Sequence, residues 1–433
     1  MKKKIVSVLL VTAMCVGLVA GCGSKGSGSG SDSAKSGDNV LEFYHGYYQD
    51  ESEWAAAQVM RDIYDDFAAQ HADGEVTFKP IAVENRDEII STKTAGGSFP
   101  DLVDCGTALS QAAVAQGLVY DLKPYIDENN LQDAVGINYT QNDVDGHIYT
   151  VHDQLESRGF WYNEAVLKAA GAATPDQWTT WDDFAAAMDK VRASGNGEYG
   201  YAAGQGSMYI MNAMLGATDE GKALLDGELT EDKINSDALA EAFKSVAAYD
   251  QANGSDHTTD DVGNLMDDFN KNGKAAVLFN GVWNASGISE DLTGDIKPAI
   301  FPGSVSVSSA GAGLAIAAGM SDAKTELALE FVKYMTSEEV QAKIFSGVQA
   351  NPCNTTLDLN ALASESGDAN AVTLATACSQ VNEAENVVPD ITYVWGDDVK
   401  GAMINALMEC AVSGTDIDAR YGQLQKELLA LIG

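Results

Sequence analysis

Basic residues are scarce in this sequence. The 433 residues include 26 lysines and arginines against 64 aspartates and glutamates, which gives a formal net charge of −38 at pH 7. A surface of this sign repels phosphate backbones and argues against a nucleic-acid partner. It also repels an anionic lipid surface, so contact with a membrane would have to come from a covalent lipid rather than from charge.

Cysteines are few, and none has the spacing of a metal site. Cys353 and Cys378 are candidates for a disulfide outside the cytoplasm, and the alternative is a set of buried free thiols that pack as small apolar side chains. The segment 142–146, NDVDG, resembles a calcium loop, but Gln141 and His152 replace its first and last acidic ligands. The sequence therefore predicts no metal and no cofactor.

No hydrophobic run is long enough for a comfortable membrane span. The apolar run 5–19 falls short of the roughly 20 residues that a spanning helix needs. It follows three lysines and ends in Ala20, Gly21 and Cys22, which is the outline of a secretory signal. The small residues before Cys22 resemble a bacterial lipobox. We therefore expect a lipoprotein signal peptide over 1–21, lipidation of Cys22 and a place on the extracytoplasmic face of the cell membrane. The alternative is an ordinary signal peptide with an incidental cysteine.

A linker separates this signal from the rest of the chain. Residues 23–39 contain no apolar side chain larger than alanine, so they cannot bury enough surface to order themselves. We interpret 22–39 as a Gly/Ser tether. The chain from residue 40 onward is long enough for two domains.

The first part of this region alternates between strand and helix patterns. Strands are predicted at 40–44, 76–83 and 99–104, with helices over about 51–70 and 86–94. This βαβ pattern indicates an α/β fold with a parallel sheet, in which ligands bind beyond the carboxyl ends of the strands. That rule places four residues on one rim: Tyr47, Tyr48, Asp104 and Thr107.

The stretch 145–163 combines a strand, a polar segment and an aromatic run that leads into a helix. The polar segment contains His152, Asp153, Gln154 and Glu156, and burying such groups without partners costs about 2–7 kcal/mol each. We therefore predict that the chain passes here from one lobe to a second one, along a wet cleft. The alternatives are a surface turn between two strands and, for Glu156, a simple ion pair with Arg158.

Several motifs, taken in order, resemble extracellular solute-binding protein family 1, the sugar-binding lipoproteins of ABC importers. They are 97–103, 117–119, 145–149, 161–163, 180–184, 269–276, 281–283 and 330–337. The resemblance implies a two-lobed periplasmic-binding-protein-like fold with discontinuous lobes, a hinge and an interlobe cleft. The N-lobe would be 40–150 plus 299–346, and the C-lobe 151–298 plus 347–433.

The resemblance also implies a substrate-binding site. The family can place a sugar-binding carboxylate at Glu156 and stacking aromatics at Tyr209, Trp283 and Trp395. Aromatic rings cover the C–H faces of sugars, while carboxylates and amides bind the hydroxyls. Asp104, Asn280 and Asn351 are further candidates, with His152 and the rim residues. Each aromatic could instead be a core residue. The loop after Pro100–Asp101 departs from the maltose-binding pattern, which argues against maltose.

The leading hypothesis is a monomeric, lipid-anchored binding protein without enzymatic activity. It would capture a mono- or oligosaccharide by hinge closure and deliver it to ABC transporter permease subunits. One alternative is the same fold binding a polyamine or another cation through cation–π contacts. The other is a surface carbohydrate-active enzyme, which needs two carboxylates about 5–9.5 Å apart.

Overall fold

The computed structural model describes residues 39–106, 109–194 and 199–433, except for the side chain of residue 205. The predicted signal peptide, Cys22, nearly all of the tether and Thr107 lie outside the described residues. Within the described ranges, no helix is long and apolar enough to cross a bilayer.

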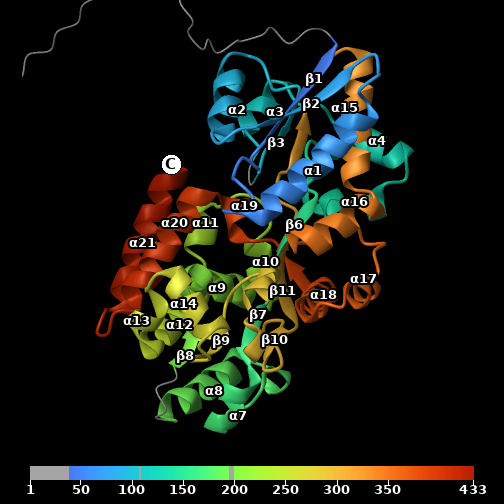
Figure 1. Ribbon diagram of the computed structural model, residues 1–433. Coiled ribbons are helices and arrows are strands. Elements are labelled where there is room, and N and C mark those ends of the chain that lie inside the picture. Colours follow the sequence, from blue (N-terminus) through green and yellow to red (C-terminus); the bar gives the residue numbers. More distant parts are fainter. Residues whose placement is uncertain (1–38, 107–108, 195–198) are drawn as a thin grey trace, which may run out of the picture. The chain divides into compact units, whose positions relative to one another are not determined.

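The N-terminal sheet has the strand order β12-β3-β1-β2. Strands β1 (Val40–His45), β2 (Thr77–Ala82) and β3 (Leu102–Asp104) are parallel, and β12 (Leu314–Ile316) joins them antiparallel to β3. Helices α1 (Ala55–Gln70) and α2 (Arg86–Ala95) connect the parallel strands, and α15 (Asp322–Met335) packs against β1 (Figure 1). The predicted βαβ pattern is confirmed.

A second sheet has the order β10-β7-β9-β8. Its strands are β7 (Phe160–Asn163), β8 (Tyr199–Ala202), β9 (Ala275–Leu278) and β10 (Ile296–Ala299). The aromatic run leads through β7 into α7 (Glu164–Ala170), as predicted. Helix α8 (Trp181–Ala193) begins with a capping box between Thr180 and Asp183, and it packs on β8. Helix α14 (Val262–Asn270) packs on β9.

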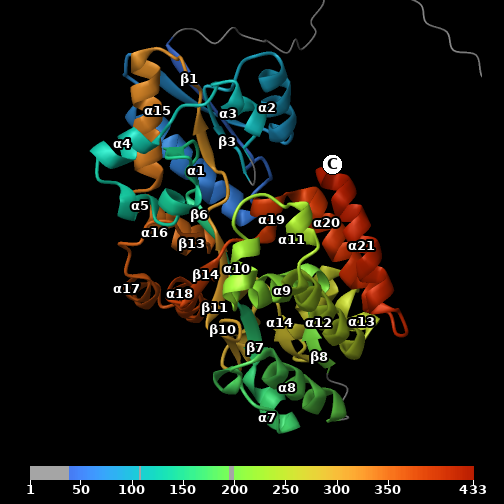
Figure 2. The same ribbon diagram turned by 180° about the vertical axis from the view of Figure 1, so that it is seen from behind.

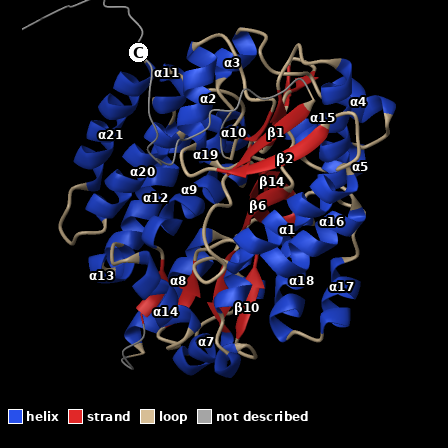
Figure 3. Ribbon diagram, turned by 45° about the horizontal axis from the view of Figure 1, so that its top comes forward, coloured by secondary structure: helices blue, strands red, loops and turns tan. Residues whose placement is uncertain are grey.

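A third sheet, β13-β6-β11-β14, contains strands from four distant parts of the chain. They are β6 (Gln154–Arg158), β11 (Val305–Ser309), β13 (Asn351–Pro352) and β14 (Asn386–Val388). The polar segment of 152–156 is therefore largely strand, and the surface-turn alternative is wrong. Strand β6 pairs with β13 through Gln154 and Leu155 and with β11 through residues 156–158. Figure 3 shows β6 and β14 of this sheet between β1 and β2 of the first sheet and β10 of the second. Helix α18 (Ala369–Asn382) packs on β11 (Figure 2).

Helices of the C-terminal half pack beside the second and third sheets. They include α9 (Ser207–Gly216), α12 (Asp237–Asn253), α19 (Ile391–Trp395), α20 (Asp397–Cys410) and α21 (Ile417–Ile432). Trp395 is the last residue of α19 and not part of the helix that carries Val399, because Gly396 separates the two helices with a φ of +88°. The other α-helices and paired strands of the described residues are short: α3 (Gln111–Ala115), α4 (Lys123–Glu128), α5 (Gln132–Val135), α6 (Asn138–Gln141), α10 (Asp219–Leu224), α11 (Glu231–Ile234), α13 (Ser255–Thr258), α16 (Glu338–Lys343), α17 (Leu359–Ser366), β4 (Asp143–Val144) and β5 (His147–Ile148).

The buried apolar residues fall into two groups along the chain. One group takes its members from 41–151 and 312–344, around the N-terminal sheet. The other takes them from 160–307 and 345–428. The family resemblance predicts Phe301, Val305 and Val307 in the N-lobe, but they belong to the second group. The chain therefore passes between the two cores three times, at residues 152–159, at 308–311 and between 344 and 345.

The four described cysteines are buried and free. The disulfide alternative for Cys353 and Cys378 is therefore wrong. Burial raises the pKa of both thiols above the ordinary value. The thiol of Cys353 donates to the carbonyl oxygen of Ala134 at 3.4 Å, so it acts as a packed core group.

Candidate functional site

Strand β6 presents polar side chains on one of its faces. Because successive side chains of a strand point to opposite faces, Gln154, Glu156 and Arg158 share one side. Leu155 and Ser157 share the other side, where they are 6% and 0% exposed. The pattern of burial thus selects the face of β6 on which a ligand would lie.

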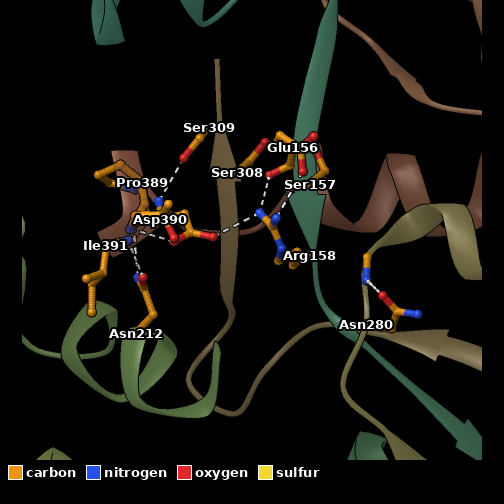
Figure 4. Close-up of polar contacts among 12 residues, drawn as sticks. Glu156, Ser157, Arg158, Asn212, Asn280, Ser308, Ser309, Pro389, Asp390 and Ile391 are labelled. Carbon is orange, nitrogen blue, oxygen red and sulfur yellow. Dashed lines mark hydrogen bonds and ion pairs between the residues drawn. The ribbon is translucent and has the colours of Figure 1, made fainter. Parts of the chain in front are cut away.

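Arg158 is the centre of this face. Its Nη2 atom lies 2.9 Å from Oε2 of Glu156, and its Nη1 atom lies 3.0 Å from Oδ2 of Asp390 (Figure 4). The side chain of Arg158 is only 7% exposed, whereas that of Glu156 is 34% exposed. The ion pair of Glu156 with Arg158, given as an alternative above, is confirmed, and it leaves one flank of the carboxylate open to water.

Two aromatic rings face the guanidinium group. Its carbon lies 4.7 Å from the ring centre of Tyr209, on α9, and 5.2 Å from that of Trp283, in the 3-10 turn Val282–Gly287. Burial by itself lowers the pKa of Arg158, but Tyr209, Asp390 and Glu156 together raise it above its usual value, so the group stays charged. Three predicted site residues, Glu156, Tyr209 and Trp283, are therefore gathered around Arg158.

Asp390 is held from two sides. It is 1% exposed, its Oδ1 caps α19 by accepting from Thr392 N at 2.8 Å, and its own backbone N–H donates to Oγ of Ser309 at 2.7 Å. Asn212 of α9 accepts from Ile391 N at 2.7 Å and donates to Pro389 O at 3.0 Å (Figure 4). Helix α9 thus carries Tyr209 and also fixes the partner of Arg158.

The indole of Trp283 lies directly over Gly281. A Cβ atom at Gly281 would be 2.5 Å from Cε3 of this indole, so only glycine leaves room for the ring in this position. Gly281 pairs with Arg158 in a β-bridge, and its carbonyl oxygen accepts from Trp161 Nε1 at 2.9 Å. Asn280 folds onto the same turn, with its Oδ1 accepting from Gly281 N at 2.8 Å (Figure 4).

On the side of the N-terminal sheet, Tyr47 is linked to β6. Its hydroxyl accepts from Nε2 of Gln154 at 2.9 Å, and its ring stacks on Trp54. Tyr48 in the same loop is 45% exposed. Asp104 lies at the end of β3, where it pairs with Arg86 at 2.5 Å and accepts from Gly106 N at 2.9 Å.

Comparisons with known proteins identify the family of this chain. Residues 62–371 match the model of the bacterial extracellular solute-binding proteins. The chain belongs to this family. A solute-binding protein of Streptococcus pneumoniae, solved in complex with the blood group A-trisaccharide, is 46% identical to it. That similarity covers 90% of this chain and 100% of the pneumococcal one, with a TM-score of 0.80. The family resemblance stated from the sequence is confirmed.

More distant structures share the fold of this solute-binding protein. A chitin oligosaccharide binding protein is 20% identical, with a TM-score of 0.68 over 91% of this chain and 99% of that one. The sugar-binding protein MalE from Xanthomonas citri is 18% identical, with a TM-score of 0.69 over 91% and 98%. A search of curated protein sequences finds no match. The two-lobed, periplasmic-binding-protein-like α/β fold predicted above is confirmed.

Three other predicted site residues, Asn351, Trp395 and His152, make their contacts within the protein. Asn351 is fully buried, and its amide nitrogen donates to Ser157 at 2.7 Å and to Asn382 at 2.9 Å, so it joins β13 to β6 and has no face for a ligand. Trp395 is 8% exposed within a hydrophobic core, and its Nε1 is buried without a hydrogen-bond partner among the described residues. The Nδ1 atom of His152 lies 2.7 Å from the carbonyl oxygen of Ala310, at the second passage between the cores.

Sequence reasoning missed Arg158, Asp390 and Asn212 as members of the site. The alternation of QLESR in 154–158 is a period-2 signal that predicts a strand, and it would have put Arg158 on the same face as Glu156. No local signal marks Asp390 or Asn212, because both reach the site through contacts with distant segments.

Proposed function

We propose that this solute-binding protein holds an oligosaccharide against the polar face of β6, between its two lobes. The observation that carries the proposal is the convergence of Glu156, Tyr209 and Trp283 on Arg158. The rings offer flat apolar surfaces for the C–H faces of a sugar, and the open flank of Glu156 accepts hydrogen bonds from hydroxyl groups. The trisaccharide bound by the 46%-identical pneumococcal protein supports this ligand class.

The length of the face favours an oligosaccharide over a single sugar ring. Gln154, which bonds Tyr47 at one end, is four residues from Arg158 at the other. At about 3.3 Å per residue, the two side chains are separated by roughly 13 Å along the strand. A ligand that touches both the Tyr47 end and the Trp283 end therefore has to extend over more than one ring.

Tyr47, Tyr209 and Trp283 explain how a bound ligand would favour closure of the two lobes. Tyr47 comes from the core of the N-terminal sheet, whereas Tyr209 and Trp283 pack with the second group of apolar residues. A sugar in contact with both sets favours the closed state by its extra affinity for that state. The passages at 152–159 and 308–311 would supply the hinge.

A cationic solute fits these rings less well. The guanidinium of Arg158 lies within 5.2 Å of both ring centres, so its positive charge would repel a polyamine bound at these rings but would not repel an uncharged sugar. Catalysis is also disfavoured, because Glu156 and Asp390 are both paired with Arg158. We therefore propose binding without turnover.

Calorimetric titration tests the proposal. The protein is titrated with the blood group A-trisaccharide, with galactose and with spermidine, and we expect the trisaccharide to bind most tightly. Glu156→Gln should weaken that binding about 10- to 100-fold, because a hydrogen bond to a charged group contributes about 1.5–3 kcal/mol. Glu164→Gln is the matched control, since Glu164 also pairs with a basic residue, Lys297, but lies outside the site. Tighter binding of spermidine, or equal effects of the two variants, would contradict the proposal.

We further propose that the mature protein is anchored through lipid on Cys22 and delivers its ligand to ABC transporter permease subunits. The Ala20-Gly21-Cys22 sequence after an apolar run supports the anchor. Cells fed an alkyne-labelled fatty acid should label the wild-type protein, and Cys22→Ser should abolish the label and release the protein into the medium. An unlabelled wild-type protein would refute the anchor.

A further inference from the structure

The loop between β1 and α1 carries two aromatic side chains in contact with water. Tyr48 is 45% exposed and Trp54 is 43% exposed. Every other strongly exposed large apolar side chain in the described part of the chain is aliphatic. The exposed parts of the two rings offer apolar surface that a ligand could cover, and covering it would contribute its burial free energy.

Trp54 is nevertheless held in one orientation. Its ring stacks on Tyr47, with 5.3 Å between ring centres and 29° between planes. Its backbone N–H donates to Asp50 O at 2.9 Å, and Arg61 Nη1 donates to Tyr47 O at 2.9 Å and to Gln49 O at 2.7 Å. Tyr47 covers one face of the indole, so the exposed part of Trp54 is a rigid apolar surface.

The position of this surface connects it with the face of β6. The loop follows the carboxyl end of β1, a central strand of its sheet, where ligands of open α/β sheets bind. Tyr47, the residue beneath Trp54, is hydrogen-bonded to Gln154 of β6, two residues before Glu156. A continuous set of contacts therefore runs from Trp54 through Tyr47 and Gln154 along the strand to Arg158.

We propose that Trp54 is a ligand-contact residue whose exposed face stacks on a sugar ring of the bound oligosaccharide, at the end opposite Trp283. This inference rests on the proposed function and deepens it. A rigid aromatic surface binds a ring at low entropic cost, since little side-chain freedom is lost on contact. Trp54 would thereby select oligosaccharides over single sugars, because only a ligand longer than one ring reaches both indoles.

Titration of variants with the blood group A-trisaccharide and with galactose tests the inference. We expect Trp54→Ala to weaken trisaccharide binding at least tenfold, Trp54→Phe to retain most of the affinity, and galactose binding to change less than twofold. Val412→Ala, at a residue that is 51% exposed, is the surface control and should bind both sugars as the wild type does.

A fluorescence measurement on the wild-type protein does not depend on the folding of the alanine variant. Saturating trisaccharide should reduce acrylamide quenching in the wild type, and this protection should be smaller in Trp54→Phe. The inference would be overturned if the trisaccharide protected the wild type and Trp54→Phe equally from acrylamide quenching and Trp54→Ala bound it with wild-type affinity. If Trp283→Ala loses binding at the same time, the proposed function stands without Trp54. If the wild type binds neither sugar, both proposals fall.

Discussion

Replacing Gly281 by alanine tests how far the position of the Trp283 ring decides ligand affinity. Gly281 has φ −75° and ψ 176°, values that alanine adopts without strain, so the backbone has no reason to change. The added Cβ, however, would lie 2.5 Å from Cε3 of Trp283, with two further ring carbons nearer still. The indole must retreat by at least about 1 Å to reach an ordinary carbon–carbon contact of roughly 3.5–4.0 Å.

The displacement of the indole affects sugar binding and the free energy of unfolding by different terms. Moving the indole changes its contact with Arg158, which is worth about 0.5–2 kcal/mol, and displaces the surface offered to the sugar. We expect the dissociation constant to rise about tenfold, which is about 1.4 kcal/mol. The backbone change from glycine to alanine gains about 0.4–1 kcal/mol from the unfolded chain and offsets part of the lost contact with Arg158, so the free energy of unfolding should change by less than about 2 kcal/mol.

The assay is calorimetric titration with the blood group A-trisaccharide, alongside urea unfolding of the same samples. Gly294→Ala is the matched control, because a Cβ at Gly294 would meet no atom within 4 Å, and its affinity should equal that of the wild type. Wild-type affinity in Gly281→Ala would refute the argument that the ring position is set by the missing side chain beneath it.

Three further predictions concern the groups that hold the site and the core. Arg158→Ala leaves Asp390 buried without its partner. The free energy of unfolding, measured by urea titration, should fall by about 3–5 kcal/mol. A loss below about 1 kcal/mol would contradict a stabilising role for the buried ion pair. Asn212→Ala removes two hydrogen bonds that fix Pro389 and Ile391 and should cost about 1–3 kcal/mol in the same titration, and unchanged stability would argue against that anchoring role. Burial raises the pKa of Asp250 from 3.8 to about 7, so the folded state holds the proton more tightly than the unfolded state, and stability should fall as pH rises through this range. Asp250→Asn keeps an oxygen that can accept from Tyr201 and Ser207. In this variant the free energy of unfolding should differ less between pH 5 and pH 8 than in the wild type. Equal pH dependence of the variant and the wild type would exclude this role for Asp250.

The sequence predicts the parts of the fold that depend on neighbours along the chain. The N-terminal sheet follows from three apolar strands separated by amphipathic helices, and the start of α8 follows from Thr180 and Asp183. The third sheet could not be predicted in this way. Strand β14 pairs with β11 in the register Asn386 to Val305, and a pairing over that separation leaves no periodic signal in either segment.

The candidate site, too, can be predicted from the sequence only in part. The family resemblance predicts Glu156, Tyr209 and Trp283 as site residues, and the structure brings them together around Arg158. The resemblance also predicts Trp395, but this last residue of α19 packs into the core. Whether an aromatic side chain faces solvent or core depends on its contacts with distant segments, and those contacts leave no signal beside Trp395 in the sequence.

The composition of the second apolar core limits how early in synthesis that core can form. That core includes Phe160 together with Leu424 and Leu428 of α21, so its first and last members are separated by most of the chain. A nascent chain that still lacks α21 has no means to complete it, and a domain generally acquires its fold only as a whole unit. The second core is therefore expected to form only after α21 has been synthesised, whereas the first core has all of its members by residue 344.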